Sequence, residues 1–340
     1  MLDFADVLNL PLIWGILIAT AVFLYVLLDG FDLGCGILFP FAPSHECRSR
    51  MMNSIAPFWD GNETWLVLGG GGLFAAFPVA YAILMPAVYI PVIIMLLGLI
   101  LRGVAFEFRF KAGEGDRRIW DTCFHFGSLT AAFMQGMILG TMVMGIEVEG
   151  RSYAGGPLDW AHGFAVMCGV AMVFGYALLG ATWLIYKTDG KTQDWARDVA
   201  RYVLIWVGIA MAIVSLSMPI SDPRIYALWF STPNLYLLAP VPLITLGVFI
   251  LIWRDIGAAE AEVRPFLCSI GVFLLGYIGL GISLYPWIVP FAFTLEEAAA
   301  ASTSQSILLI GTVILLPIIL CYTAYSYYVF RGKSSHESLY

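Results

Sequence analysis

The chain has 340 residues, of which 60% are hydrophobic and only 12% are charged, and its mean hydropathy is +0.86. Soluble domains carry about 25% charged residues, so this composition excludes an ordinary soluble protein and predicts an all-α, polytopic membrane protein. The formal net charge of -7 says little about partners, because the placement of charges matters more than their sum in a membrane protein. The six cysteines stand singly without a C-x-x-C pair, which argues against a metal or redox site.

Nine apolar segments along the chain are long enough to cross a membrane, which takes about 20 residues of helix. In chain order they cover residues 9–29, 53–76, 79–102, 119–144, 160–187, 200–219, 235–254, 265–286 and 305–330. No connection between them is long enough for a soluble domain, so we expect one transmembrane domain over residues 1–340. Asp3 and Asp6 take the place of the basic region of a signal peptide and no A-x-A site follows, so the first segment is expected to be a retained helix.

Positive charges fall almost wholly on one side of this arrangement. Fifteen of the 17 Lys and Arg residues follow the first, third, fifth and seventh segments or lie in the C-terminal tail, and only Arg151 and Arg224 fall on the other side. Lys and Arg are retained on the cytoplasmic side of a membrane. The distribution therefore predicts an N-terminus outside and a C-terminus in the cytoplasm.

Two acids stand at the predicted cytoplasmic end of the first segment, in the sequence LLDGFDLGCG. Asp29 and Asp32 are three residues apart, so they share one face if the helix continues through Gly30. An ionisable group costs about 2.5–3.5 kcal/mol at the centre of a bilayer, and such groups are therefore candidates for function. The alternative is a pair of helix-end acids in the headgroup region, although the negative end of the helix dipole does not favour them.

A second polar group opens the segment 53–76, which reads NSIAPFWDGNETWLVLGGGG in its first part. Asp60, Glu63 and Thr64 have the spacing i, i+3, i+4 and are expected on one face, with Asp60 about 10 Å from the start of the helix. Two carboxyl groups so close in a low dielectric are not both expected to ionise, and such a group suits a proton-conducting path. The alternative is a structural hydrogen-bond cluster that locks helices together.

The third polar group is LRGVAFEFRFK, at the predicted cytoplasmic end of the segment 79–102. Arg102 and Glu107 are five residues apart, a spacing that does not suit a direct pair on one helix. Arg102 can instead reach the carboxylates of the first two segments and compensate their buried charge. The alternative is a basic helix end that only follows the orientation rule.

Four motifs, taken in order along the chain, resemble the second subunit of the cytochrome bd-type quinol oxidases. They are LDGFDLG (28–34), NSIAPFWDGNETWL (53–66), FAAFP (74–78) and LRGVAFEFRFK (101–111). The hydropathy pattern is similar to that family over the whole chain, whereas the motifs end at residue 111. The short connections and modest length are most similar to the branch known as cyanide-insensitive oxidases.

The resemblance implies two four-helix bundles plus a peripheral helix, in a multi-pass protein of the bacterial plasma membrane. It implies a heterodimer whose larger subunit I holds haem b and haem d and oxidises quinol, while dioxygen is reduced to water with protons from the cytoplasm and without pumping. This chain is then the subunit without haem ligands, and it is not catalytic alone. Membrane lipid, quinone and a small single-helix accessory subunit are further partners that the resemblance allows, whereas nucleic acid is not expected.

The resemblance also carries over to individual residues. Asp60 of the WDGN motif matches an acid proposed to line the proton route of the family, and Asp29 and Asp32 match acids on the same inner side. Arg102 matches a family arginine, and Glu107 stands where Asp is common, which leaves its role open. No residue is assigned to catalysis, to a cofactor or to a metal. The predicted polar pathway consists of Asp29, Asp32, Asp60, Glu63, Arg102 and Glu107.

Two other classes of protein fit parts of the pattern. An ion-coupled secondary transporter would use the inner carboxylates to bind H⁺ or Na⁺, but transporters of that kind usually have paired halves. The acidic motifs have no counterpart after residue 200, which counts against a transporter. A purely structural assembly subunit, whose acids only pack, is the remaining alternative.

Overall fold

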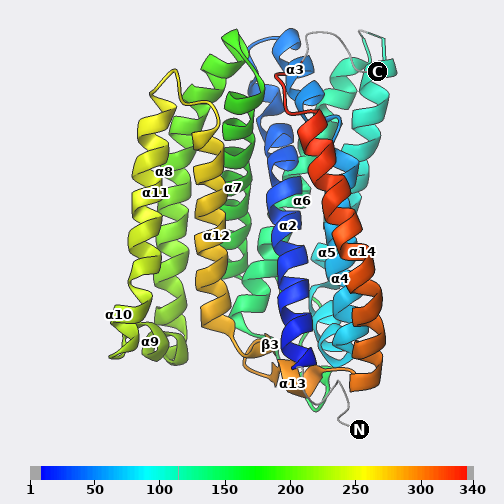
Figure 1. Ribbon diagram of the computed structural model, residues 1–340, viewed down its shortest axis with the longest axis vertical. Coiled ribbons are helices and arrows are strands. Elements are labelled where there is room, and N and C mark those ends of the chain that lie inside the picture. The colour runs from blue at the N-terminus through cyan, green and yellow to red at the C-terminus, as the bar shows by residue number, and fades with distance from the viewer. Residues whose placement is uncertain (1–8, 114, 335–340) are drawn as a thin grey trace.

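Long helices that run side by side make up most of the described chain, which comprises residues 9–113 and 115–334 of a computed structural model (Figure 1). Asp3 and Asp6, which support the expectation for the N-terminus, lie outside these residues. Within them, eight helical spans are long and apolar enough to cross a membrane, which confirms an all-α polytopic membrane protein. These spans contain α2 (Leu10–Leu38), α5 (Pro78–Lys111), α6 (Arg117–Met144), α7 (Gly163–Lys187), α8 (Gly190–Ser221), α11 (Pro240–Ile256), α12 (Arg264–Leu284) and α14 (Ser302–Val329).

The remaining predicted segment, 53–76, is not one continuous helix, so that expectation is wrong. α3 (His45–Ile55) ends two residues before Pro57, and α4 (Trp59–Ala76) begins after a turn. Proline has no N–H to donate and its ring clashes with the preceding helical turn, which accounts for the break. Asp60 therefore lies in the first turn of α4, and not two turns into a longer helix.

Both α2 and α5 extend beyond their predicted ends at residues 29 and 102, so those two boundaries are wrong. They finish at Leu38 and Lys111, which places Asp29 and Arg102 each about 13 Å from the end of its helix. We call this end of the molecule, where α2 and α5 finish, the inner end. Gly34 lets α2 continue against α7, because a Cβ there would lie 1.9 Å from the backbone oxygen of Tyr176.

The long helices form two groups of four with one helix at the margin (Figure 1). The first group is α2, α4, α5 and α6, and the second group is α7, α8, α11 and α12. Where the groups meet, both α2 and α6 pack on α7. α14 packs mainly against α2 and α4. The two four-helix bundles with a peripheral helix that the resemblance implies stay an expectation, as does the membrane orientation.

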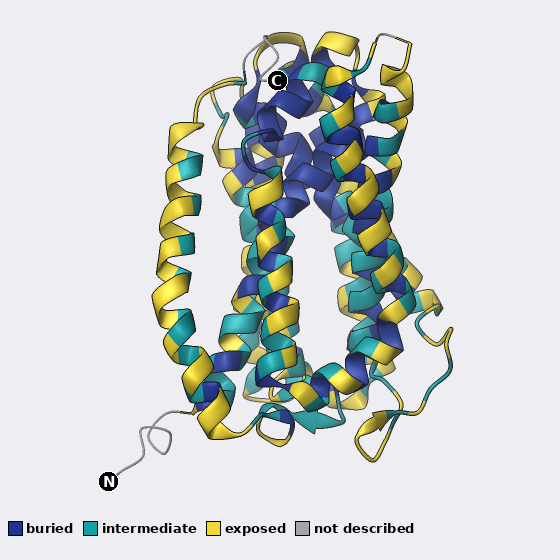
Figure 2. Ribbon diagram, turned by 90° about the vertical axis from the view of Figure 1, so that its right-hand side faces the viewer, coloured by how far each residue is buried: buried dark blue, intermediate teal, exposed yellow. Residues whose placement is uncertain are grey.

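Short elements complete the described chain. β1 pairs with β2 and β3 with β4, both antiparallel, with Val148 opposite Tyr153 and Trp287 opposite Thr294. Buried residues gather at the inner end of the molecule, as Figure 2 shows. The short elements are η1 (Phe39–Phe41), β1 (Val148–Glu149), β2 (Ser152–Tyr153), α9 (Pro223–Phe230), α10 (Asn234–Leu238), β3 (Trp287–Val289), β4 (Phe293–Thr294) and α13 (Leu295–Ala298).

Candidate functional site

Polar side chains from α2, α4, α5 and α14 meet near the inner end of the molecule. The set lies about two helical turns below the ends of α2 and α5, so most of it is covered by helix. We call it the inner cluster, and it consists of Asp29 and Asp32 of α2, Asn62 and Glu63 of α4, Arg102 of α5 and Tyr327 of α14.

Arg102 joins three helices through two ion pairs. Its Nη1 lies 2.5 Å from Oδ1 of Asp29, and its Nη2 lies 2.7 Å from Oε1 of Glu63. The side chains of Arg102 and Asp29 are buried, whereas that of Glu63 is 31% exposed. The guanidinium also lies 5.9 Å from the ring centre of Trp59, which adds a cation–π contact. One positive charge therefore compensates acids from both α2 and α4.

Asn62 connects α2 to α14 through its amide group. Its Nδ2 donates to Oδ2 of Asp32 at 2.7 Å and to the backbone oxygen of Leu28 at 3.1 Å. Its Oδ1 accepts a hydrogen bond of 3.0 Å from the hydroxyl of Tyr327. Since Asn62 is buried, these protein groups supply the hydrogen bonds that water would otherwise make.

Each buried aspartate of the cluster has one oxygen that its contact with Arg102 or Asn62 leaves open, Oδ2 of Asp29 and Oδ1 of Asp32. The hydroxyl of Tyr25, one turn earlier on α2, is within hydrogen-bonding reach of the Asp29 carboxylate. Neither aspartate is exposed to solvent. A proton placed on either oxygen would break none of the hydrogen bonds described above, so both positions suit a group that gains and loses protons.

A chain of three neutral side chains leads away from Asp29 and was not predicted. The hydroxyl of Tyr176 donates to Oε1 of Gln135 at 2.5 Å, and Nε2 of Gln135 donates to the hydroxyl oxygen of Tyr25 at 2.8 Å. Both donations point toward Asp29, so the chain orients Tyr25 beside that carboxylate. An isolated Gln in the apolar run FMQGMI was the signal that sequence reasoning passed over.

Two predicted residues of α4 are not buried in the cluster. Asp60 and Thr64 are exposed on the side of α4 that faces away from α2, while Asn62 and Trp65 face inward. The break at Pro57 sets this rotation, because α4 begins anew after it. Burial of Asp60 within this chain is therefore a wrong expectation.

Glu107 also lies apart from the cluster. It is half-buried and has no ion pair or hydrogen bond within residues 9–113 and 115–334. The neighbouring Arg109 instead pairs with Asp121 of α6, with Nε 2.5 Å from Oδ1, and Arg48 lies 3.8 Å from the other oxygen. Asp121 is the only acid in α6, and that rarity was a usable signal of a buried pair.

The described histidines lie on separate elements and make local contacts. Nδ1 of His125 lies 3.2 Å from the backbone oxygen of Gly36, and His162 caps α7 by accepting from the backbone N–H of Ala165. Across the part of the chain that the structure describes, no group of three or more His, Cys, Asp and Glu could hold a metal ion. The described side chains thus offer no ready ligand set.

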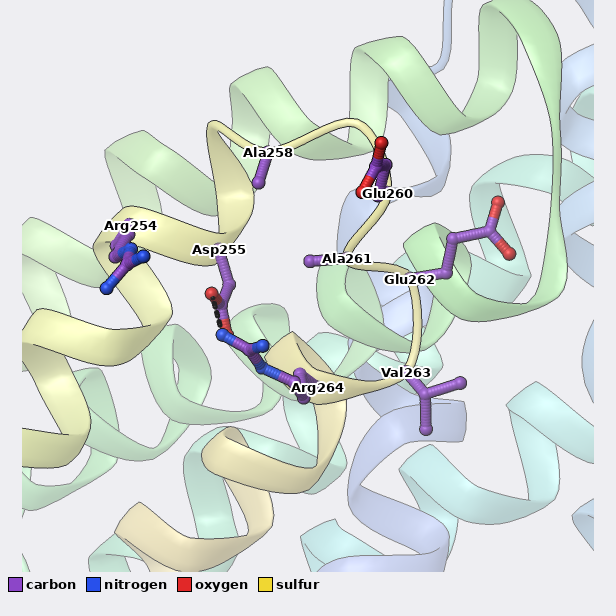
Figure 3. A pocket seen from close by; sticks show the side chains of 8 residues that line it. All are labelled: Arg254, Asp255, Ala258, Glu260, Ala261, Glu262, Val263 and Arg264. Atoms are coloured by element: carbon purple, nitrogen blue, oxygen red, sulfur yellow. Dashed lines mark hydrogen bonds and ion pairs between the residues drawn. The ribbon is translucent and has the colours of Figure 1, made fainter.

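A separate surface cavity of about 500 Å³ lies at the loop between α11 and α12 (Figure 3). Within it, Asp255 and Arg264 point toward each other, and both carboxylate oxygens accept hydrogen bonds from the guanidinium. Arg197 of α8 donates to five backbone oxygens of this loop, from Asp255 to Ala261. The cavity contains none of the predicted site residues, and its buried acid is already satisfied, so we regard it as structural.

The chain is similar over nearly its whole length to one family of membrane proteins. The family of cytochrome bd terminal oxidase subunit II matches residues 10–330 of the chain. Subunit 2 of the cytochrome bd ubiquinol oxidase of Bacillus subtilis strain 168 is 30% identical over 335 residues, which are 96% of this chain and 97% of that protein. Subunit 2 of the cytochrome bd-I ubiquinol oxidase of Escherichia coli K12 is 30% identical over 369 residues, covering 97% of this chain and 96% of that protein.

One solved structure and one permease are also similar to the chain, over very different lengths. The structure of bd oxidase from Geobacillus thermodenitrificans superposes with a TM-score of 0.74 at 18% identity, over 95% of this chain and 99% of that chain, which shows a shared fold. The lysine-specific permease LysP of Escherichia coli K12 is 30% identical over only 126 residues, which are 33% of this chain and 25% of that protein. The match over residues 10–330 and the two full-length relatives are decisive: the chain belongs to the cytochrome bd terminal oxidase subunit II family.

Proposed function

We propose that the inner cluster carries protons from the cytoplasm into a respiratory quinol oxidase, in which this chain is the subunit without haem. Family membership makes the chain part of a membrane-bound quinol oxidase with a subunit I partner. Haem b and haem d belong to that partner in this proposal, and dioxygen is reduced to water there. Because that reduction consumes protons, a route from the cytoplasm is a contribution that a haem-free subunit can make.

The charge balance of the inner cluster carries the proposal. Asp29, Asp32 and Glu63 supply three carboxyl groups, and Arg102 supplies the one guanidinium that pairs with two of them. Ionisation of all three acids would leave buried negative charge without a partner, which is strongly unfavourable. The cluster is therefore suited to hold and release protons at the two aspartate oxygens that Arg102 and Asn62 leave open.

Glu63 is the natural entrance to this route. It is the one acid of the cluster with substantial exposure, and Asp60 lies one turn before it on the open side of α4. An acid on the outer surface at this depth would face hydrocarbon unless a protein surface covered it. Gly61, Gly70 and Gly71 of α4 also have open space around them, and small residues allow another helix to approach closely. We infer that subunit I covers this side of α4.

The other two hypotheses account for fewer of these observations. A structural role explains the Arg102 bridge, but it gives no reason for the buried carboxylate oxygens that Arg102 and Asn62 leave open. A secondary transporter has only the partial LysP match, which covers a third of the chain, in its favour. The proton route remains the function that the cluster supports best.

Asp32→Asn in the purified oxidase complex tests the proposal. Asparagine keeps the size of the side chain but cannot exchange the proton, so we expect oxygen reduction to fall about a hundredfold or more, the effect typical of a positioned proton-transfer group. The reduced-minus-oxidised spectra of haem b and haem d should stay at wild-type intensity. Turnover is measured with an oxygen electrode under excess quinol, and proton uptake with the complex in vesicles.

Asp255→Asn is the matched control, because Asp255 is an equally buried aspartate paired with an arginine in the second group. It should leave turnover per haem unchanged. Wild-type turnover in Asp32→Asn would refute the proton route. Loss of the haem spectra and of the complex in Asp32→Asn would favour the structural hypothesis instead.

A further inference from the structure

The last long helix contributes one side chain to the inner cluster although it lies at the margin of the chain. Most side chains of α14 face outward, with Ile310 and Val313 each 64% exposed and Tyr325 66% exposed. Tyr327 differs, because its ring stacks on Phe58 with centres 4.3 Å apart and planes 15° apart. The stacked ring directs its hydroxyl to Asn62.

The amide of Asn62 transmits the position of this hydroxyl to Asp32. Its oxygen can only accept, so Tyr327 must be the donor in the 3.0 Å hydrogen bond between them. Its nitrogen then donates to Oδ2 of Asp32 and to the backbone oxygen of Leu28. Donation to the amide oxygen polarises the amide and strengthens its N–H groups as donors, since linked hydrogen bonds reinforce one another at low dielectric.

We propose that Tyr327 is a positioning residue for the proton route: it fixes the amide of Asn62 and through it the carboxyl group of Asp32. The hydroxyl neither touches the reacting centre nor passes a proton itself in this role. α14 thereby sets the environment of a buried acid on α2 while making few other contacts with the rest of the chain. The inference rests on the proposed function, because it requires that Asp32 exchange protons during turnover.

Other charged or titratable groups also act on Asp32 and must stay in place in any test. These groups are Asp29 and Cys35 of α2, Glu63 of α4 and Arg102 of α5. None of them is hydrogen bonded to Tyr327 or Asn62 within the described residues, so a change at Tyr327 leaves their own contacts intact.

Tyr327→Phe in the whole oxidase complex is the decisive variant, because it removes the hydroxyl and keeps the ring on Phe58. We expect the pH midpoint of quinol-driven oxygen reduction to shift by about one-half to one pH unit, the size expected when one hydrogen bond is lost. The haem spectra should be unchanged. The carboxylic C=O stretching band that changes on reduction of the complex should also shift. Tyr325→Phe is the matched control on the same helix, and it should alter neither quantity.

A second variant tests whether Tyr327 acts through Asn62. In an Asn62→Ala background, adding Tyr327→Phe should produce no further shift of the pH midpoint, because the connecting amide is gone. An unchanged pH profile and C=O band in Tyr327→Phe would overturn the inference, as would an equal further shift in the Asn62→Ala background. Loss of the haem spectra in both Tyr327→Phe and the double variant would overturn it too, by showing a role in assembly. If Asp32→Asn slows turnover while Tyr327→Phe has no effect, the proton route stands and only this inference fails.

Discussion

Asp29 and Asp255 are both buried aspartates paired with an arginine, yet the two pairs differ in how they are completed. Asp255 accepts from Arg264 with both oxygens, at 2.5 Å and 2.9 Å, and the side chain of Arg264 is 63% exposed. Arg102 is buried, divides its contacts between Asp29 and Glu63, and pairs with only one oxygen of Asp29. The first pair is satisfied within itself, whereas the second has room for a proton. Geometry of this kind separates a structural ion pair from a candidate functional one.

Removing the arginine from each pair should give the largest difference in stability between the two sites. Arg102→Gln leaves several buried acids without a cation, and breaking such a pair costs about 3–5 kcal/mol. Arg264→Gln should cost less, about 1–3 kcal/mol, because it leaves the buried carboxylate of Asp255 without its donor while Arg264 itself lies largely in solvent. The measurement is thermal unfolding of the purified complex, followed by haem absorbance. Equal losses of stability in the two variants would show that burial does not distinguish the pairs.

Arg197, which lies near the pair of Asp255 and Arg264, should have a smaller effect on stability when it is replaced. It holds the loop between α11 and α12 by donating to five backbone oxygens. Arg197→Gln should destabilise this loop by about 0.5–1.5 kcal/mol, because partly buried and exposed carbonyl groups lose their common donor. Hydrogen exchange of the amides in residues 255–261 should quicken while turnover per haem stays at the wild-type value. A fall in turnover would mean that this region is coupled to the reaction.

The exposed pair of Glu262 and Lys333 should have the smallest effect. The hydrogen bond from Lys333, supported by Gln193, lowers the pKa of Glu262 below its ordinary value of 4.5. A lowered pKa stabilises the fold above the ordinary value, and this contribution is lost as the pH falls through the lowered one. Glu262→Gln should therefore cost only about 0.2–1 kcal/mol at neutral pH, because both side chains are partly in solvent.

Unfolding temperatures of the wild type and Glu262→Gln should converge as the pH is lowered below about 4 or the salt is raised to 1 M. The wild type should be the more stable of the two at neutral pH and low salt. A gap that persists at low pH would place the effect elsewhere than in the ionised carboxylate.

Much of the fold was predictable because membrane helices must be long and apolar. Eight of the nine predicted segments match described spans, because a helix pairs all its backbone groups internally and an apolar composition lets it lie in hydrocarbon. The neighbourhood of Asp29 and Arg102 was also foreseeable, because buried charges need partners and no other arginine stood in the first three segments. These inferences depend on composition and charge, which act in the same way in every fold.

Other features depend on contacts that the sequence does not reveal. α2 continues past residue 29 because Gly34 meets the backbone of α7, and that contact joins residues far apart in the chain. Tyr327 lies 265 residues from Asn62, and nothing in the run SYYVF distinguishes it from Tyr328. The outward turn of Asp60 follows from the break at Pro57, whose effect on helix rotation is set by packing.

The contact between α2 and α7 also limits which sequences this protein can tolerate over evolution. A Cβ at Gly34 or Gly180 would fall within 3 Å of the opposite backbone, so these two positions accept no other amino acid without separating the two groups of helices. Gly61, Gly70 and Gly71 of α4 meet nothing within 4 Å in this chain. Selection for growth on a saturation library should therefore reject every change at the first two positions. Rejection of substitutions at the three α4 positions would then trace the outline of the partner subunit.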